Sequence, residues 1–415
     1  MVEVKPFKGL RPIQDKIEEV ASPPYDVLNS DEARKRVKGN PLSFLHVIKP
    51  EIDLDPELDP YDKKVYLKGK ENFDYLIKQG ILIQDNKSCF YVYKLQMQGR
   101  EQVGLVACAS VQDYNNNRIK KHELTRPDKE EDRLHHIDYI KAQTGPVFLT
   151  YRSNREINNL ITEAMQSQPV YNFTGDYNVE HTLFIIDKEY LIGKIQTAFK
   201  GIEALYVADG HHRSAAACRL QKIRKDNNPQ HTGQEEYNYF LSVIFPHDQM
   251  HILDYNRVIK DIGGMSEQEF IDKISNMFEI TEYDKNMPFK PQKIHEFGMY
   301  FNGTWDRLQA RKDIFNDTDP IGQLDVAILQ NNILEKLLGI TDPRNDARVD
   351  FVGGIRGLEE LERYVNQGDY QVAFSLYPTS IHQLLSVADA GKVMPPKSTW
   401  FEPKLYSGVV IHTLE

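Results

Sequence analysis

The chain has 415 residues, 40% hydrophobic and 27% charged, a composition typical of a globular protein large enough for two or three compact units. Its net charge of −10 argues against a protein that coats DNA, because such binding needs basic surface. Three cysteines in apolar runs, Cys89, Cys108 and Cys218, predict reduced core residues. No window approaches the roughly 18 apolar residues of a membrane helix, and no signal peptide is evident, so we expect a cytoplasmic protein without a membrane partner.

In the first part of the chain, apolar spacing predicts both strands and helices. The predicted elements are a short strand over 42–50, a helix over 63–80 ending on Gly80, a β-hairpin over 88–111, and a strand then a helix over 181–201. A further strand and helix follow over 204–221, and two more strands over 238–246 and 251–259. This alternation indicates an α/β core.

The pattern changes after about residue 262. The predicted elements there are an amphipathic helix over 265–280 with Ser266 and Glu269 as a capping box, a hairpin over 297–311 with an Asn-Gly turn, a helix over 323–339, and a strand, helix, loop and strand over 370–412. We therefore expect a mixed α/β (α+β) fold, with a core over 1–262 that carries an inserted hairpin and loops. A C-terminal α/β portion over 263–415 is expected to pack back on this core.

The stretch "ALYVADGHHRSAAACRLQ" (204–221) places polar groups where a buried strand becomes a helix. The start of a helix presents backbone N–H groups and a positive dipole end, and both bind anions. Candidate phosphate-binding residues are Gly210, His211, His212, Arg213 and Ser214, and Asp209 is placed to hold a metal ion that accompanies the phosphates. The alternative is that Asp209 only caps the helix and that the histidines lie on the surface.

The segment "KKHELTRPDKEEDRLHH" (120–136) is dense in charge. His122 and Glu123 lie near Arg126, and Asp132 and Arg133 follow, which are residue types that bind phosphate and move protons. A solvated loop followed by a helix start would have the same composition.

Prolines stiffen two further candidate segments. In "VMPPKSTWFEPKL" (393–405) two prolines precede the candidate binding residues Lys397, Ser398, Thr399 and Lys404. We expect this segment to fold over a phosphate site and exclude water. Its alternative is a structural loop pinned by its aromatic residues. Near the start, "SPPYDVL" (22–28) presents Asp26 to a pocket or forms a plain turn.

Several well-known catalytic signatures do not occur in the sequence. There is no HExxH, no paired CxxC, no Walker P-loop and no GxSxG. These absences set aside a zincin-type metalloprotease, a zinc module, a P-loop kinase and an α/β-hydrolase.

The motifs "SPPYDVL", "NPLSFLHVIKPE", "HELTRPDKEEDRL", "ADGHHRSAAA" and "MPPKSTWFEPKLYSG" together resemble the family of bacterial and archaeal proteins called domain of unknown function 1015. More distantly, "LRPI" and "ADGHHR" resemble the ParB/sulfiredoxin-like superfamily, and the Asp-Gly-His-His-Arg string is similar to that of free-serine kinases. The resemblance implies a ParB/sulfiredoxin-like, nucleotide-binding core in which the stretch from Asp209 to Arg213 contacts nucleotide phosphate.

This chain also departs from its distant relatives. Sulfiredoxins have a catalytic cysteine where this chain has His211, and the DNA-binding helix-turn-helix of ParB has no counterpart here. In "LDYNRVI" the resemblance predicts histidine where the chain has Asn256, so the role of this strand end is open.

The leading hypothesis is an enzyme: a kinase that phosphorylates a small hydroxyl compound, above all free L-serine, with ATP or ADP as co-substrate and Mg²⁺ as cofactor. Glu123 or Asp26 would act as the general base, and Asp209 and His211 complete the catalytic candidates. His122, Arg126, Asp132, Arg133 and Lys404 would bind substrate or stabilise charge.

The alternative hypothesis is a non-catalytic regulator or scaffold that binds CTP or ATP. A third hypothesis is a ParB-like nuclease, but the net negative charge of the chain argues against it. Whether the chain forms a homodimer is left open.

Overall fold

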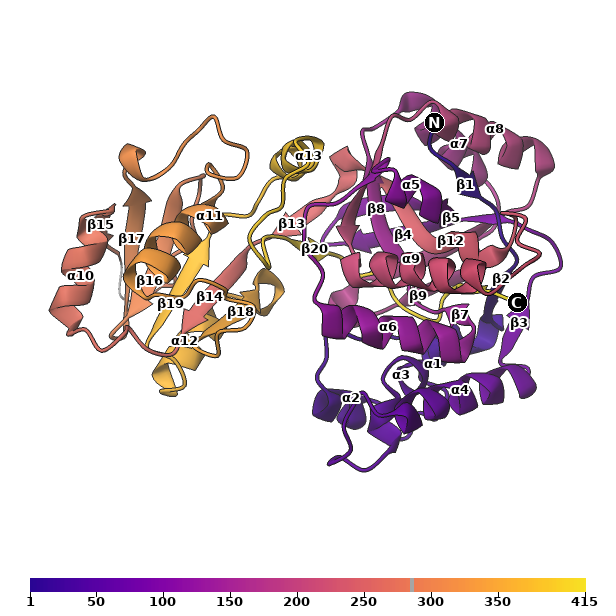
Figure 1. The fold of residues 1–415 in the computed structure, drawn as a ribbon, viewed down its shortest axis with the longest axis horizontal. Coiled ribbons are helices and arrows are strands. Elements are labelled where there is room, and N and C mark those ends of the chain that lie inside the picture. The colour runs from indigo at the N-terminus through magenta and orange to yellow at the C-terminus, as the bar shows by residue number, and fades with distance from the viewer. Residues whose placement is uncertain (284–286) are drawn as a thin grey trace. The chain divides into compact units, whose positions relative to one another are not determined.

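The computed structural model describes residues 1–283 and 287–415 (Figure 1). The chain forms two compact units: unit 1 comprises residues 1–121, 125–250 and 403–415, and unit 2 comprises residues 122–124 and 251–402. Each unit contains sheets and helices, which confirms the mixed α/β class.

The main sheet of unit 1 has nine strands in the described part of the chain. In spatial order these are β6 (Ile119–Lys120), β11 (Leu205–Asp209), β8 (Val147–Tyr151), β12 (Tyr239–Pro246), β5 (Arg100–Ser110), β4 (Phe90–Met97), β10 (Glu180–Ile186) and β9 (Tyr171–Thr174), with β1 (Val4–Lys5) paired to β5. The pairs β6–β11 and β8–β12 are parallel, and the other pairs are antiparallel.

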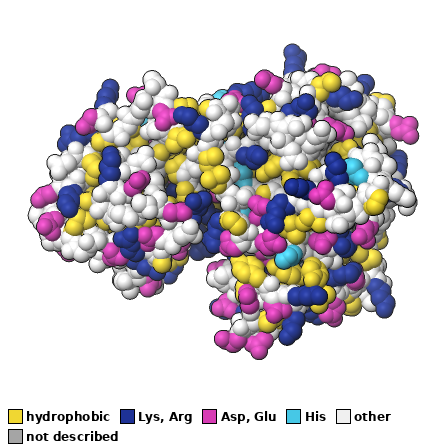
Figure 2. Space-filling view, viewed as in Figure 1, with side chains coloured by type: hydrophobic (Ala, Val, Ile, Leu, Met, Phe, Trp, Pro, Cys, Tyr) yellow, Lys and Arg dark blue, Asp and Glu magenta, His cyan; other side chains and the backbone are white. Residues whose placement is uncertain are grey.

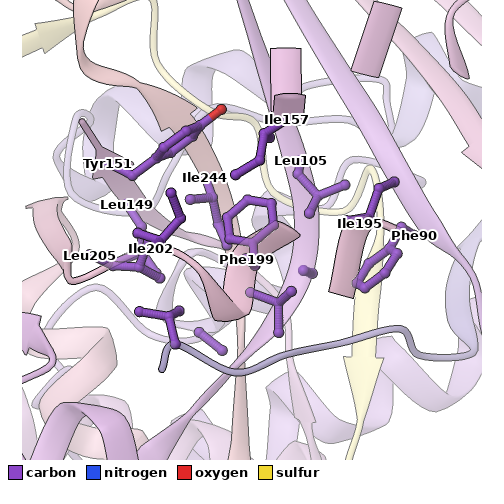
Figure 3. Close-up of a cluster of buried hydrophobic side chains, with 14 of the residues drawn as sticks. Phe90, Leu105, Leu149, Tyr151, Ile157, Ile195, Phe199, Ile202, Leu205 and Ile244 are labelled. Carbon is purple, nitrogen blue, oxygen red and sulfur yellow. The ribbon is translucent and has the colours of Figure 1, made fainter. Parts of the chain in front are cut away.

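Helices α7 (Arg155–Ala164) and α8 (Glu189–Lys200) bury apolar side chains against this sheet. Figure 3 shows Ile157, Ile195 and Phe199 packed with strand residues of the same core. Helices α6 (Pro127–Ile140) and α9 (His211–Asp226) lie side by side in Figure 1 and join through a separate apolar cluster. This pairing brings two segments that are distant in the sequence to one place.

A four-stranded sheet completes unit 1, in the order β3 (Leu82–Gln84), β2 (Gly9–Pro12), β21 (Ile411–Thr413) and β7 (Ala142–Gln143). Unit 1 also contains further helices. They are α1 (Ile17–Val20), α2 (Ser30–Arg36), α3 (Leu45–Ile48), α4 (Lys63–Lys78), α5 (Val111–Asn115) and the short 3₁₀ helices η1 (Gln14–Lys16), η2 (Pro50–Asp53), η3 (Asp176–Asn178), η4 (Glu236–Asn238) and η5 (His247–Gln249).

Unit 2 has a sheet of six antiparallel strands among its described residues: β15 (Phe278–Glu282), β17 (Thr304–Ala310), β16 (Glu296–Phe301), β19 (Val372–Leu376), β14 (Tyr255–Ile259) and β18 (Val349–Gly353). Strands β13 (His251–Leu253) and β20 (Trp400–Glu402) form a separate pair. The helices are α10 (Glu267–Ser275), α11 (Asp325–Leu329) with its π-helical continuation η7 (Gln330–Leu337), α12 (Glu359–Asn366), α13 (Ile381–Asp389), η6 (Lys312–Ile314) and η8 (Gly354–Arg356).

Most predicted elements are confirmed, including both hairpins and the capping box of α10. The predicted strand over 42–50 is wrong, because this stretch forms α3 followed by η2, which starts at Pro50. A short apolar run is compatible with a buried helical turn as well as with a strand, so its periodicity could not distinguish a helix from a strand. The stretch 251–259 divides into β13 and β14, which belong to different sheets.

The cysteines and the surface agree with the composition. Cys89 and Cys108 are buried free thiols, and Cys218 is half-buried. Figure 2 shows acidic and basic side chains interspersed on the face that it draws. Among the described residues, none of the helices has the length and apolar character that a bilayer crossing requires.

Candidate functional site

The junction between β11 and α9 forms the centre of the candidate site. Gly210 adopts φ +94° as the N-cap of α9, a left-handed conformation that favours glycine. Its N–H donates to Asp209 Oδ1 at 2.7 Å, which fixes the turn. The N–H groups in the first turn of an α-helix point out of the helix start, so this turn presents donors to an anion.

The Arg213 side chain folds back over this glycine. A Cβ built at Gly210 would lie 3.1 Å from both Nε and Nη2 of Arg213. Arg213 Nη1 also donates to the carbonyl oxygen of Pro146. The guanidinium is therefore held at the helix start, where it adds charge and directional donors.

We expect Gly210→Ala to lower the free energy of unfolding by about 1–3 kcal/mol, because it combines backbone strain with a close contact to Arg213. Chemical denaturation would measure this loss. Gly193→Ala is the matched control: Gly193 is exposed in α8 and a Cβ there would meet nothing within 4 Å, so stability should stay level or rise by about 0.5–1 kcal/mol. Equal effects of the two substitutions would contradict the assigned role of Gly210.

Asp209 is paired with Lys404, whose Nζ lies 3.1 Å from Oδ2. Both residues belong to unit 1, since 403–415 returns to it. Burial alone would raise the pKa of Asp209, but the charges of Lys404 and Arg213 outweigh it and hold that pKa well below its usual value. Asp209 is therefore an ionised carboxylate that holds Lys404 at the end of β11.

These surroundings bear on the predicted metal role of Asp209. A Mg²⁺ ion takes oxygen ligands and is disfavoured by nearby positive charge. The charges that act on Asp209 are those of Lys404, Arg213 and His211, and its oxygens already accept from Lys404 and from Gly210. These contacts occupy both carboxylate oxygens, and the metal role of Asp209 stays a prediction.

The start of α6 adjoins the start of α9. The backbone N–H of Arg126, the N-cap residue of α6, donates to His212 Nε2 at 3.0 Å. His212 Nε2 is thus an acceptor, which assigns the proton of a neutral ring to Nδ1. The Arg126 side chain pairs with Asp128 at 2.9 Å and remains partly exposed. Two helix N-termini, each a positive dipole end, therefore meet at one place.

A second cluster on α6 faces a small cavity in unit 1. Arg133 is buried, pairs with Asp132 at 2.7 Å and stacks on Tyr25, with its Cζ 3.9 Å from the ring centroid. Arg133, Tyr25 and Arg213 all line a cavity of about 30 Å³, which has room for roughly two water molecules. Asp26 follows Tyr25 and is exposed.

Buried partners surround this cavity. His136, on α6, hydrogen-bonds through Nε2 to the carbonyl oxygen of Val47 at 3.0 Å. Burial, together with the charge of Arg133, lowers the pKa of His136 to about 3, so this ring is neutral. The backbone of Ser407 pairs with that of Ser22 at 2.8 Å, which joins "SPPYD" to "KLYSG". Pro146, Ser407 and Tyr25 were not among the predicted site residues, because their roles arise from contacts between distant segments.

Two predicted binding residues are hydrogen-bonded within the protein. Ser214 is fully buried and its hydroxyl donates to the His211 carbonyl at 3.0 Å, so it stabilises the first turn of α9. Asp132 is buried and accepts from Arg133 and from Tyr66 at 3.1 Å. Both polar groups are engaged by the protein itself, and their roles at the site stay predictions.

The remaining predicted residues lie in unit 2. The carbonyl of His122 accepts from the Met394 N–H at 2.8 Å, which ties the segment of His122 and Glu123 to the loop that carries Lys397. Lys397 is exposed and has φ +56°. That residues 393–405 cover the phosphate site stays a prediction.

Hydrogen bonds fix the backbone of this loop within unit 2. The carbonyls of Pro396 and Lys397 accept from the buried Arg257, at 3.3 and 3.0 Å. Ser398 Oγ donates to the Pro395 carbonyl at 2.6 Å, and the Ser398 carbonyl accepts from Thr379 at 2.9 Å. Thr399 follows, half-buried. The hydroxyl of Ser398 is therefore engaged by the loop itself.

Asn256, whose role was open, is fully buried in β14. Its Nδ2 donates to Asp254 Oδ2 at 2.5 Å, and its Oδ1 accepts from the Leu376 N–H at 3.0 Å. This residue therefore fastens β14 to β19 and has a structural role.

The chain is thus a mixed α/β protein in which the starts of two helices, α6 and α9, meet in unit 1. The chain matches the family described as "Protein of unknown function (DUF1015)" over residues 4–327, and it belongs to this family. None of the curated proteins matches it.

Several solved structures are similar to this chain. A conserved hypothetical protein from Pyrococcus furiosus is 14% identical, with 73% of this chain and 94% of that chain covered and a TM-score of 0.37. A free serine kinase in complex with AMP is 12% identical, with 72% and 86% covered and a TM-score of 0.37. SbnI with a C-terminal truncation, from Staphylococcus aureus, is 12% identical, with 72% and 82% covered and a TM-score of 0.36. Likenesses this slight carry no functional argument.

Proposed function

We propose that this chain is a nucleotide-dependent kinase that phosphorylates the hydroxyl group of a small molecule, with free L-serine as the best single acceptor and ATP or ADP as donor. The observation that carries the proposal is the junction at which α6 and α9 begin together, joined from Arg126 to His212 at 3.0 Å. Arg213 and Lys404 add two cationic side chains around the same turn. The Asp-Gly-His-His-Arg string, which resembles that of free-serine kinases, lies at this point.

In this function the junction binds the terminal phosphates of the nucleotide. The N–H groups at the start of α9 and the guanidinium of Arg213 donate to phosphate oxygens, and His211 and His212 line the same turn. Each helix end contributes about 0.3–1 kcal/mol toward an anion at an exposed position, and more where it is partly buried. Charge-assisted hydrogen bonds from Arg213 contribute about 1.5–3 kcal/mol each. The protein thus positions the donor and neutralises its charge, which is most of what phosphoryl transfer requires.

The transfer step needs an acceptor and a base. The acceptor oxygen attacks the terminal phosphorus, the new O–P bond forms, and the bond to the bridging oxygen breaks, so that ADP leaves from ATP or AMP from ADP. The hydroxyl proton passes to a carboxylate, for which we propose Glu123, with Asp26 as the second candidate. The core would be of the ParB/sulfiredoxin-like type.

One observation favours a second candidate, a regulator or scaffold that binds CTP or ATP without turnover. The cavity beside Arg213 has a volume of only about 30 Å³, which is too small for an amino acid. In that case the junction alone would bind the phosphates.

Product formation separates these two functions. The full chain would be incubated with ATP or ADP, magnesium and a panel of amino and hydroxy acids, and phosphorylated products detected by mass spectrometry. A nucleotide-dependent phosphorylated product supports the kinase. Nucleotide binding without any product supports the regulator and overturns the kinase.

We expect Glu123→Gln or Asp26→Asn to lower turnover by roughly 10²–10⁴-fold, the usual size of a general-base effect, while nucleotide affinity stays unchanged. Steady-state kinetics and calorimetry on both variants would measure this. If each variant retains full activity, neither carboxylate is the base.

A further inference from the structure

A larger pocket lies elsewhere in unit 1. Part of it is formed by a sequence motif that has no role in the proposed function. The pocket is formed by "NPLSFLHVIKPE" (40–51), η2 and α4, and its volume is about 390 Å³. Ligand pockets usually range over roughly 300–1,000 Å³, so this one is large enough for a small molecule. It shares none of its described lining residues with the cavity beside Arg213.

One side of the pocket is a fixed polar network centred on His46. His46 Nδ1 lies 2.8 Å from Asp53 Oδ1, and Nε2 lies 3.2 Å from the Asn40 carbonyl oxygen. Because both partners are acceptors, both ring nitrogens serve best as donors, and the hydrogen bond with Asp53 raises the pKa of His46. Asn72 Nδ2 braces the pair, at 2.7 Å from the His46 carbonyl and 2.8 Å from Asp53 Oδ2. Hydrogen bonds thus hold the His46 ring by both of its nitrogens beside the Asp53 carboxylate.

Lys68 also lines the pocket and supplies its ammonium group. Of its three N–H donors, one is directed to Glu71 at 3.2 Å, and the Glu71 side chain is 70% exposed and screened by water. The Lys68 ammonium is therefore the cationic group that the lining offers to a negatively charged ligand.

Apolar residues also belong to the lining: Val47 and Leu76 are buried, and the ring of Tyr75 is half-exposed. A ligand that fits this lining has a negative group and an apolar part.

We propose that this pocket binds a small carboxylate whose charged group pairs with Lys68 and whose apolar part packs on the ring of Tyr75. The site does not rest on the proposed kinase function. One hydrogen bond links its lining to that of the smaller cavity, because the carbonyl of Val47 accepts from His136, which lines the cavity beside Arg213.

Calorimetry with benzoate as the probe tests this site, with benzamide as a neutral molecule of the same shape. We expect the full chain to bind benzoate and to bind benzamide at least about tenfold more weakly. Lys68→Met should weaken benzoate binding by roughly tenfold, because it removes a charge-assisted hydrogen bond. Lys70→Met is the matched control, since Lys70 lies on the same helix, pairs with Asp74 at 2.8 Å, and is not part of the pocket lining.

The test has clear adverse outcomes. Equal binding of benzoate and benzamide would show that charge does not select the ligand. Equal losses of benzoate affinity in the Lys68 and Lys70 variants would show that benzoate binds outside this pocket. No heat from benzoate at about 10 mM would mean that the pocket does not take this class of ligand. Each of these results overturns the proposal, and none affects the nucleotide site.

Discussion

An Arg213→Met variant should bind nucleoside di- and triphosphates roughly 100-fold more weakly than the native chain. The guanidinium packs against Gly210 at the start of α9, and its Nη1 is anchored on the Pro146 carbonyl. The other N–H groups of the guanidinium would donate charge-assisted hydrogen bonds to phosphate oxygens, each contributing about 1.5–3 kcal/mol. Loss of two such bonds corresponds to about two orders of magnitude in Kd. Isothermal titration calorimetry with ATP and ADP would measure the change.

Arg219→Met is the control for this experiment. Arg219 lies on the same helix but pairs with Glu131 at 2.5 Å and with Glu130 at 3.3 Å, away from the helix start. Its loss should leave nucleotide affinity within about twofold. If the Arg213 variant binds nucleotide as tightly as the Arg219 variant, Arg213 is not part of the nucleotide site.

The second large effect concerns Asp325, at the start of α11 in unit 2. Its Oδ1 accepts from the His295 N–H at 2.8 Å, whereas Oδ2 is buried without a hydrogen-bond partner among the described residues. Burial, with the nearby charge of Glu296, raises the pKa of Asp325 to about 8. A carboxylate held here at high pH is therefore costly.

The direction of the pH dependence follows from this shift. The folded chain holds the Asp325 proton more tightly than the unfolded chain, whose pKa is the ordinary 3.8. The stability that Asp325 contributes is therefore fully present below about pH 4 and is lost as the pH rises to about 8. We expect Asp325→Asn, which keeps the acceptor for His295, to remove this loss.

Thermal unfolding at pH 5 and pH 8 measures the effect. The loss in the native chain should be on the order of a few kcal/mol, which corresponds to roughly 5–10 °C in the Tm of a unit of this size. Asp272→Asn is the control, because Asp272 is exposed on α10 of the same unit and should leave the pH dependence unchanged. A pH dependence that is the same in the Asp325 variant and the native chain would contradict the assignment.

Local features of the fold were predictable from the sequence because they depend on neighbouring residues. Gly210 and Asn302-Gly303 adopt the left-handed backbone that their residue types favour, with φ of +94°, +51° and +79°. The periodicity of 63–78 predicted α4, which ends just before Gly80. The stretch 45–48 was mistaken for a strand because four residues, three of them apolar, are too few to show whether the period is that of a helix or of a strand.

The sequence could not reveal contacts between distant segments. It selected the Asp209 and Lys404 motifs separately, but not their ion pair across 195 positions. It likewise treated Arg126 and His212 as two patches, and only the packing of α6 on α9 joins their helix starts. It also assigned Ser214 to phosphate by residue type, whereas burial directs its hydroxyl to the backbone.

The claim on which the kinase proposal depends is that the backbone amides and cationic side chains just after Asp209 hold the phosphates of a nucleotide. Isothermal titration of the full chain with ATP, ADP and CTP, with magnesium present, tests it most directly. We predict saturable binding of at least one of them at one site per chain, and its loss in the Arg213→Met variant. No binding of any of the three nucleotides would contradict the account.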